Sequence, residues 1–503
     1  MKISRQTFIL FLLFLLNFLA RFSLISKGPY HADCLFLAVQ AEATLHTLKI
    51  HYLQGTGLPL TAIVGAIFIG LGKWIGTTDI VMAVNFMNVL LASVCVPIFY
   101  LLLRKLFDDK AALVGSVVLS LNTIFLPVST FGNSHILAIL FFFLGLLFIF
   151  QYFHSEGNVT YFLAGICFGL MGAARLQDLF VILPAIAFLF CVRPGSDKKR
   201  RYMNLILFFL IIFMVTSAFY IPFLVNKNYF SMANSFQQYK TVIFQALERV
   251  NLNSFRIVLY WMFQSISFVG CVGSAIGLWL MYRGEKKLFA SFIALFIVPT
   301  FMLVSLWWFF RYTAPRMYLI PAIILIIPLS YAFSALNKRN TKLFNTAFIL
   351  LIFLLVFNNR GIYETVKFRH DHALLSDFYR WIGQVTEPGA NIIERDHSLF
   401  IKFYAQRIPL GAPITLFEAK EEDLKHYKEH INLLLESHIP VYVTETGLTG
   451  YPERLKFNEF MQSNFEFELV GQRDIEDWYG DVLIHSVMEN SLYRLKKKQI
   501  EPI

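Results

Sequence analysis

The residues best suited to chemistry in this chain are ionisable side chains that stand beside long apolar runs. Asp33 follows a Gly-Pro pair and opens a helix-like segment that extends to Ile50. A carboxylate at such a place can accept a proton from a nucleophile. It can also cap the helix, because Asp is a preferred N-cap residue. For an isolated Asp, capping is the commoner role, so both interpretations stay open.

A second group consists of cations beside aromatic residues. Arg311, Tyr312 and Arg316 lie in one short segment of this kind, and Lys240 lies in the polar segment of about residues 226–256. Guanidinium groups bind phosphate oxygens in a planar, bidentate manner. Cations and aromatic residues also anchor membrane proteins at the lipid–water boundary. The pattern favours neither role over the other.

Three further polar residues stand between apolar runs. Arg175 and Asp178 lie three residues apart and could form an ion pair. His135 begins another apolar run, where it could bind a sugar or phosphate or simply mark the boundary. Ionisable groups at membrane depth are a hint of function.

The elements that must position these residues are membrane helices. The chain has 503 residues, of which 57% are hydrophobic. Apolar runs of roughly 20 residues recur, the length that spans a hydrocarbon layer of ~30 Å. The formal net charge is +11, but Lys and Arg fall largely in short loops, which is the positive-inside pattern. This distribution argues against a nucleic-acid partner. Five cysteines without metal-ligand spacing predict neither a disulfide framework nor a metal site.

The basic loops predict about eleven crossings. The expected spans are residues 7–26, 79–103, 111–128, 133–153, 159–174, 177–192, 203–224, 257–282, 288–308, 315–335 and 342–358. The Gly-rich run 57–75 is expected not to cross, because an extra crossing would invert every later loop. An odd number of crossings puts residues 27–78 and the C-terminal region outside the cell. The alternative is twelve crossings with a cytoplasmic tail.

The chain is expected to change character near residue 359. From there helix-like and strand-like segments alternate, which predicts a small α/β domain with a mostly parallel sheet. Expected strands are residues 391–394, 414–417, 441–445 and 465–470, with a possible edge strand at 492–495. Expected helices are residues 372–386, 396–405, 420–437 and 451–463.

This layout resembles the GT-C membrane glycosyltransferases, especially the branch with the protein O-mannosyltransferases and the lipid A aminoarabinose transferase. The similarity covers the whole chain in layout. It is carried by Asp33, by Gly57-Leu58-Pro59-Leu60, by Arg175, by Arg311-Tyr312-x-x-Pro315, and by the stretches 375–393 and 403–407. Cys34 departs from the family, which often has an acid there, and so does the sequence Asn133-Ser134-His135 at a second acidic position.

The resemblance implies transfer of a sugar from a polyprenyl phosphate to a lipid, glycan or protein acceptor, with inversion, at the outer face of a bacterial inner membrane. Asp33 would be the catalytic base. The implied phosphate- and lipid-binding residues are Arg311, Arg316, Lys240 and Tyr312, and the candidate substrate-binding residues are His31, Glu42, His135 and Arg175. No metal or other cofactor is implied. The alternative function is a non-enzymatic transporter or flippase of lipid-linked material, although the sequence has no internal repeat of the kind common in transporters.

Overall fold

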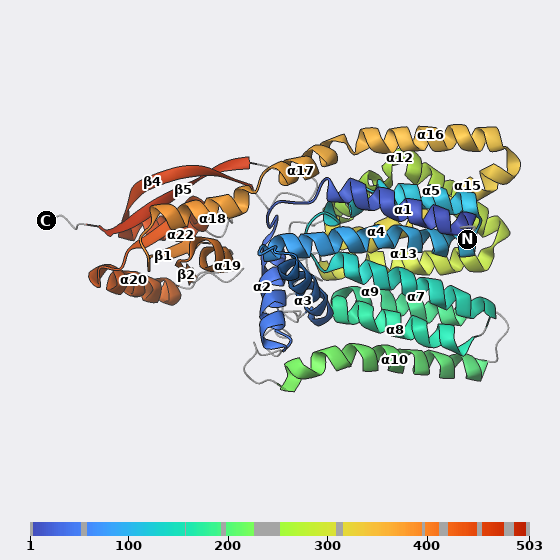
Figure 1. Ribbon diagram of the computed structural model, residues 1–503, viewed down its shortest axis with the longest axis horizontal. Coiled ribbons are helices and arrows are strands. Elements are labelled where there is room, and N and C mark those ends of the chain that lie inside the picture. The colour runs from blue at the N-terminus through green and yellow to red at the C-terminus, as the bar shows by residue number, and fades with distance from the viewer. Residues whose placement is uncertain are drawn as a thin grey trace. The chain divides into compact units, whose positions relative to one another are not determined.

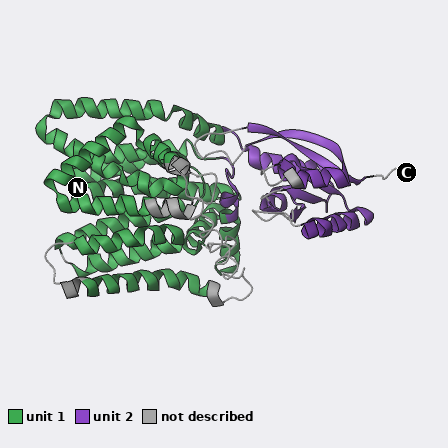
Figure 2. Ribbon diagram, turned by 180° about the vertical axis from the view of Figure 1, so that it is seen from behind, with its two compact units in different colours: residues 1–26, 37–370, 481–484 green, residues 27–36, 371–480, 485–503 purple. Residues whose placement is uncertain are grey.

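A computed structural model of the chain describes residues 4–51, 58–155, 157–192, 198–225, 252–307, 315–394, 398–411, 421–449, 455–476 and 487–498. The chain forms two compact units, shown in different colours in Figure 2. The helical unit comprises Met1–Ser26, Leu37–His370 and Asp481–Ile484. The mixed unit comprises Lys27–Phe36, Asp371–Gly480 and His485–Ile503.

The helical unit is a bundle of long apolar helices (Figure 1). In chain order they are α1 (Arg5–Phe22), α2 (Ala32–Thr47), α3 (Pro59–Trp74), α4 (Ile80–Leu106), α5 (Asp109–Ser120), α6 (Phe125–Val128), α7 (His135–Ser155), α8 (Asn158–Ala174), α9 (Leu176–Val192), α10 (Lys198–Val225), α12 (Leu252–Gly284), α13 (Lys286–Trp307), η1 (Pro315–Tyr318), α14 (Leu319–Ile324), α15 (Ile326–Arg339), α16 (Thr341–Asn358) and α17 (Arg360–Asp371).

Side chains at the helix starts show why the helices begin where they do. Ser4, Asp79, Asp108 and Asn340 each accept hydrogen bonds from backbone N–H groups of the first turn of α1, α4, α5 and α16. Such a cap satisfies donors that have no partner within the helix. Each of these four helices therefore begins at a capping residue, close to the start expected from its apolar run.

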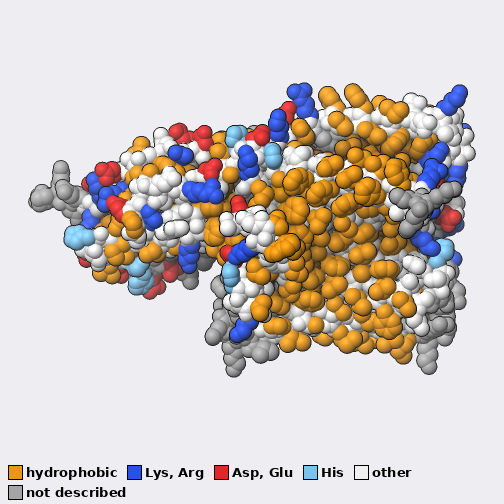
Figure 3. Space-filling view, in the orientation of Figure 1, with side chains coloured by type: hydrophobic (Ala, Val, Ile, Leu, Met, Phe, Trp, Pro, Cys, Tyr) orange, Lys and Arg blue, Asp and Glu red, His pale blue; other side chains and the backbone are white. Residues whose placement is uncertain are grey.

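Seven of the described helices are long and apolar enough to cross a membrane. They are Arg5–Phe22, Ile80–Leu106, His135–Ser155, Tyr202–Pro222, Leu259–Gly284, Arg316–Arg339 and Thr341–Asn358. Hydrophobic side chains cover the visible side of this unit, and many of the Lys and Arg side chains lie toward its ends (Figure 3). The chain is therefore a multi-span membrane protein, as its sequence predicts.

Several apolar runs differ in form from a single long span. The run 57–75 contains α3, which has 16 residues, and the expected spans 159–174 and 177–192 fold as α8 and α9, which have 17 residues each, so all three are shorter than a typical span of ~20. The expected single span 111–128 is wrong in detail, since the described chain divides it into α5 and α6. Asn122 causes the break, because its Oδ1 accepts hydrogen bonds from the N–H groups of Ile124 and Phe125 and starts a new helix.

The helix α12 is broken inside the bundle at Ser267, where φ is 66° and ψ is 164°. The break leaves backbone carbonyls without helical partners, and other elements supply donors. Asn122 donates to the Ser265 carbonyl over 3.0 Å, and Thr123 donates to the Gln264 carbonyl over 2.9 Å. Asn358, at the end of α16, donates to the same Gln264 carbonyl. Irregular backbone at membrane depth is tolerated when protein groups satisfy it in this way.

The mixed unit is built on a five-stranded sheet in the order β2-β1-β3-β5-β4. Its strands are β1 (Asn391–Glu394), β2 (Ile408–Gly411), β3 (Val441–Thr444), β4 (Phe465–Glu476) and β5 (Val487–Lys497). Its helices are α18 (Leu374–Val385), α19 (Ser398–Phe400), η2 (Ile401–Ala405), α20 (Glu421–Glu436), α21 (Glu445–Thr449) and α22 (Leu455–Asn464).

The sheet differs from its prediction in two respects. β1 pairs in parallel with β2 and β3, but β5 pairs antiparallel with β3 and β4, so the sheet is mixed rather than mostly parallel. The expected edge strand 492–495 belongs to β5, which lies inside the sheet. The reason is that β4 continues to Glu476 and forms a long pair with β5. The expected strand 414–417 lies outside the described residues, and β2 at Ile408–Gly411 pairs with β1 instead.

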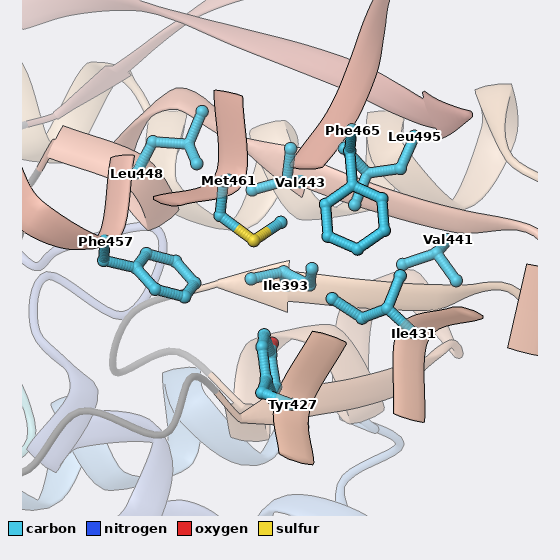
Figure 4. Packing of buried hydrophobic residues seen from close by; sticks show 10 residues of the cluster. All are labelled: Ile393, Tyr427, Ile431, Val441, Val443, Leu448, Phe457, Met461, Phe465 and Leu495. Carbon is cyan, nitrogen blue, oxygen red and sulfur yellow. The ribbon is translucent and has the colours of Figure 1, made fainter. Parts of the chain in front are cut away.

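A hydrophobic core holds this sheet against α20 and α22 (Figure 4). The core side chains are Ile393, Tyr427, Ile431, Val441, Val443, Leu448, Phe457, Met461, Phe465 and Leu495. Arg407 fastens α18 to the chain before β2. Its guanidinium donates to the backbone carbonyls of Gly383 and Thr386 at the end of α18, and to that of Ala405. The stretches that carry the family resemblance in this unit are thus joined through one side chain.

Candidate active site

Arg175 is the centre of a buried polar cluster in the helical unit. Its Nε donates to Asp178 Oδ1 over 2.9 Å, and its Nη1 donates to the Ser134 hydroxyl over 3.2 Å. Its Nη2 lies 3.1 Å from the sulfur of Met317. Both charged side chains are only about a tenth exposed, at 9% and 11%. The expected ion pair between Arg175 and Asp178 is confirmed, and it holds a fixed guanidinium group among three elements.

Local backbone structure explains how these residues meet. Arg175 is the extended residue that separates α8 from α9, and Asp178 lies in the first turn of α9. A carboxylate in that turn is favoured by the helix dipole. Thr61, in the first turn of α3, donates its hydroxyl to the Ala174 carbonyl over 3.1 Å. The beginning of α3, which carries the Leu58-Pro59-Leu60 sequence, is thereby tied to the residue before Arg175.

Arg316 belongs to the short 3-10 helix η1 and is buried. Its neighbour Met317 contacts Arg175, which brings the segment of Arg316 to the Arg175 cluster. Tyr318 fixes η1 further, because it packs with Val181 of α9 and Met262 of α12. Two guanidinium-bearing segments far apart in sequence therefore meet in one part of the helical unit.

His135 is buried and begins α7, directly after Ser134. Asn133 accepts a hydrogen bond from the His135 N–H and donates its own amide to the carbonyls of Val128 and Phe131. The sequence Asn133-Ser134-His135 is thus a structured turn at the start of α7. It presents Ser134 to Arg175 where the resembled family often has an acid.

Asp33 and His31 lie together in the segment Lys27–Phe36, which belongs to the mixed unit, so the first residues of α2 belong to that unit and the rest of α2 to the helical unit. The helix α2 begins at Ala32, so Asp33 stands within its first turn rather than at the N-cap position, which was one of the two interpretations open from the sequence. Its own N–H donates to His31 Nδ1 over 3.1 Å, and its carboxylate lies 3.4 Å from the same nitrogen. The Asp33 side chain is 53% exposed, whereas His31 is largely buried. An exposed carboxylate beside an imidazole can take up a proton from an incoming hydroxyl group.

Glu42 has a different environment from the Arg175 cluster. Lys73 of α3 donates to its carboxylate over 3.0 Å, and His46 lies 3.7 Å away. These contacts tie α2 to α3. The remaining candidates, Lys240, Arg311 and Tyr312, lie outside the described residues. Within the described ranges, no group of three His, Cys, Asp or Glu residues is arranged to hold a metal ion.

The cluster chemistry suits an anion with several oxygen atoms. Two buried arginines come from segments that meet at Met317, and one carboxylate, Asp178, faces one of them. Arginine keeps its charge in proteins and matches phosphate oxygens with its planar fork. Ser134 and Met317 are site residues that the sequence analysis missed. The sequence hinted at them only through their positions, because Ser134 is next to the predicted residue His135 and Met317 is next to the predicted residue Arg316.

Comparison with known proteins shows which family and which folds this chain resembles. Residues 61–219 match the sequence model of the dolichyl-phosphate-mannose-protein mannosyltransferase family. That range includes α3 from Thr61 onward, His135, Arg175 and Asp178. A search of curated proteins finds no match.

Several solved structures share the fold. ArnT from Cupriavidus metallidurans, bound to undecaprenyl phosphate, is similar with a TM-score of 0.60 and 13% identity, covering 98% of each chain. The oligosaccharyltransferase from Archaeoglobus fulgidus has a TM-score of 0.58 and 17% identity, covering 89% of this chain and 69% of its own. The arabinofuranosyltransferase AftD from Mycobacteria has a TM-score of 0.51 and 12% identity, covering 99% of this chain and 40% of its own.

The chain therefore has the GT-C fold, which confirms the resemblance predicted from its sequence. Taken with the family match, this fold indicates a glycosyltransferase of the GT-C type.

Proposed function

We propose that this protein transfers a glycosyl group from a polyprenyl-phosphate-linked sugar to an acceptor at the outer face of a bacterial inner membrane. The observation that carries the proposal is the Arg175 guanidinium, buried and held by Asp178, Ser134 and Met317 next to the segment of Arg316. ArnT, which shares the fold, binds undecaprenyl phosphate. A buried, oriented guanidinium can bind the oxygens of such a phosphate in a bidentate manner.

In the proposed reaction, Asp33 accepts the proton of the acceptor nucleophile. The nucleophile attacks the anomeric carbon from the face opposite the phosphate, the bond from that carbon to the phosphate oxygen breaks, and the sugar configuration inverts. Negative charge develops on the departing phosphate in the transition state. Arg175 and Arg316 stabilise this charge because their positions are set before the reaction begins.

The remaining predicted roles complete the proposal. Lys240, Arg311 and Tyr312 would assist the two described arginines at the lipid phosphate. His31 would orient Asp33 because its Nδ1 atom accepts the hydrogen bond from the Asp33 N–H, and His135 would contact the sugar. The acceptor is a lipid, a glycan or a protein; the archaeal oligosaccharyltransferase of the same fold was solved with a tethered acceptor peptide.

Transfer assays with three variants test this function. Asp33→Asn should lower turnover by about 10²-fold or more if Asp33 is the general base, with little change in polyprenyl phosphate binding. Arg175→Gln should weaken binding of the lipid phosphate as well as turnover. Asp377→Asn is the matched control, since Asp377 is also exposed in the first turn of a helix but pairs with Arg380.

Two outcomes would overturn the proposal. Normal turnover in Asp33→Asn would remove Asp33 from the reaction. The transporter alternative predicts that reconstituted protein moves a lipid-linked sugar across a bilayer without transferring it to any acceptor. Movement without transfer in the wild-type protein would therefore replace the enzymatic function with that alternative.

A further inference from the structure

Arg21 is a buried cation in a membrane helix, at the last turn of α1, and only 1% of it is exposed. Its Nε donates to the Ser129 hydroxyl over 2.9 Å, and its Nη1 donates to Asn17 Oδ1 over 2.5 Å. Its Nη2 reaches the Ser120 carbonyl at 3.4 Å, and the guanidinium lies over the ring of Phe125. These described partners are all neutral.

It is unusual for a buried arginine such as Arg21 to have only neutral partners among its described contacts. An arginine does not lose its proton in proteins. A buried charge is costly in a membrane helix and is usually retained for a function. Arg21 lies on α1, whereas Arg175 lies between α8 and α9, and its partners Ser134 and Met317 lie before α7 and in η1. The described contacts of Arg21 are with other residues, so a role in that site would act through the residues that Arg21 holds.

The segment from Ser129 to Ser134 is the path from Arg21 to the site. Three of its residues are hydrogen-bonded to residues outside the segment. The Thr130 carbonyl accepts from the Ser26 N–H over 3.0 Å, and Asn88 donates to the Phe131 carbonyl over 2.7 Å. The Gly132 N–H donates to Asn85 Oδ1 over 2.7 Å. The segment ends at Ser134, whose hydroxyl accepts a hydrogen bond from Arg175.

We propose that Arg21 is a positioning residue for the donor-phosphate site. It anchors the Ser129 end of the segment 129–134, and the other end of that segment orients Arg175 through Ser134. This inference rests on the proposed function, because it assigns Arg175 to the lipid phosphate. Arg21 itself does not touch the donor.

The geometry of the anchor explains why arginine is needed. Its three nitrogens serve three groups on different elements: Ser129 near α6, Asn17 within α1, and the last residue of α5, Ser120. A planar guanidinium presents donors in these separate directions at once. A lysine ammonium would keep the charge but lacks the planar fork. Charge and geometry can therefore be tested separately.

The test measures donor KM and turnover for purified, folded Arg21→Lys, Ser129→Ala and their combinations with Ser134→Ala. We expect Arg21→Lys to raise the donor KM about tenfold, because small displacements of a binding group have large effects. Ser129→Ala should raise it less, in the same direction. Arg283→Lys is the matched control, since Arg283 is also a helix-end arginine over an aromatic ring, that of Trp279, and should leave KM unchanged.

The combinations separate positioning from simple destabilisation. If Arg21 acts through Ser134, adding Arg21→Lys to Ser134→Ala should raise KM less than the product of the single effects. Fully multiplicative effects, or a normal KM in folded Ser129→Ala and Arg21→Lys, would overturn the inference. If Arg21→Lys does not fold, the donor KM values of Ser129→Ala, Ser134→Ala and their combination provide the same test. A wild-type protein without sugar transfer would instead refute the proposed function itself.

Discussion

The described polar residues of the helical unit show how buried charge is stabilised. Arg175 has a carboxylate partner, a hydroxyl and a thioether, whereas Arg21 has only neutral partners. Charge at membrane depth requires hydrogen-bonding groups around it, because no bulk water replaces them. In both clusters these groups come from more than one helix. Each arginine therefore also fixes the relative positions of the helices around it.

A residue-scale prediction concerns Tyr442 and Glu387 in the mixed unit. The Tyr442 hydroxyl donates to the Glu387 carboxylate, and this bond, with Arg494 nearby, holds the pKa of Glu387 below its ordinary value of 4.5. Burial and the same bond raise the pKa of Tyr442 to about 12. A lowered carboxylate pKa stabilises the fold above the ordinary pKa, and the stabilisation is lost as the pH falls through the folded value.

Tyr442→Phe should therefore lower the stability of the region around β3, and this loss should be largest near pH 7. The difference in stability between the variant and the wild type should become smaller as the pH falls below 4.5. Hydrogen exchange of the β3 amides in the full chain, corrected for the intrinsic effect of pH, measures this directly. Glu387→Gln serves as the control and should show the same loss of pH dependence. If the difference in exchange between Tyr442→Phe and the wild type stayed constant from pH 7 to pH 3, the bond to Tyr442 would not be the cause of the lowered pKa of Glu387.

At the scale of elements, close helix packing depends on particular glycines. Gly277 of α12 faces the backbone of α15, and a Cβ atom at this position would overlap the Pro328 carbonyl oxygen. The obstacle is backbone rather than a movable side chain. Membrane helices commonly use small residues where two backbones approach each other.

Gly277→Ala should force α12 and α15 apart and destabilise the helical unit by roughly 1–3 kcal/mol, or prevent folding. Thermal unfolding in detergent, with the yield of monodisperse protein, measures the effect. Gly70→Ala is the matched control, because Gly70 is also helical and a Cβ there would make only ordinary contacts with Leu45. An unfolding temperature equal in both variants would show that the α12–α15 packing is looser than described.

At the scale of the whole molecule, the proposed function depends on the orientation of the chain in the membrane, because it places sugar transfer at the outer face. The odd number of expected crossings puts the mixed unit and Asp33 outside. Cys34 would be a natural reporter, but it is buried, so an impermeant thiol reagent should not label it in the folded protein. Exposed positions elsewhere are better suited.

Two engineered cysteines test the orientation after Cys191 and Cys271 are replaced. Leu433→Cys, on exposed α20, should react with an impermeant reagent added to intact spheroplasts. Glu285→Cys, between α12 and α13, should react only after the membrane is opened. The reverse pattern would place the mixed unit in the cytoplasm and favour twelve crossings, because an extra crossing at residues 57–75 inverts every later loop. If both cysteines react only after opening, the mixed unit is cytoplasmic and the predicted orientation is wrong.

Much of the fold follows from local sequence. The apolar runs predict the long helices, because each run is long enough to span lipid and polar caps mark its ends. The mixed unit is likewise anticipated in its helices α18 and α20 and in its strands β1 and β3. Sheet order was not predictable, because β5 pairs with β3 and β4 through contacts between distant residues. The break in α12 was also missed, since its cause lies in Asn122, Thr123 and Asn358 on other elements.

For the candidate site, the sequence by itself determined which ionisable residues were available: Asp33, Arg175 with Asp178, His135 and Arg316. Their types and their places beside apolar runs were sufficient for that. Only the tertiary structure decided that Arg175 meets Ser134 and Met317, that Glu42 is paired with Lys73, and that Arg21 anchors the segment leading to Ser134. The physical reason is that a guanidinium binds in several directions at once, and helices far apart in the sequence supply its partners.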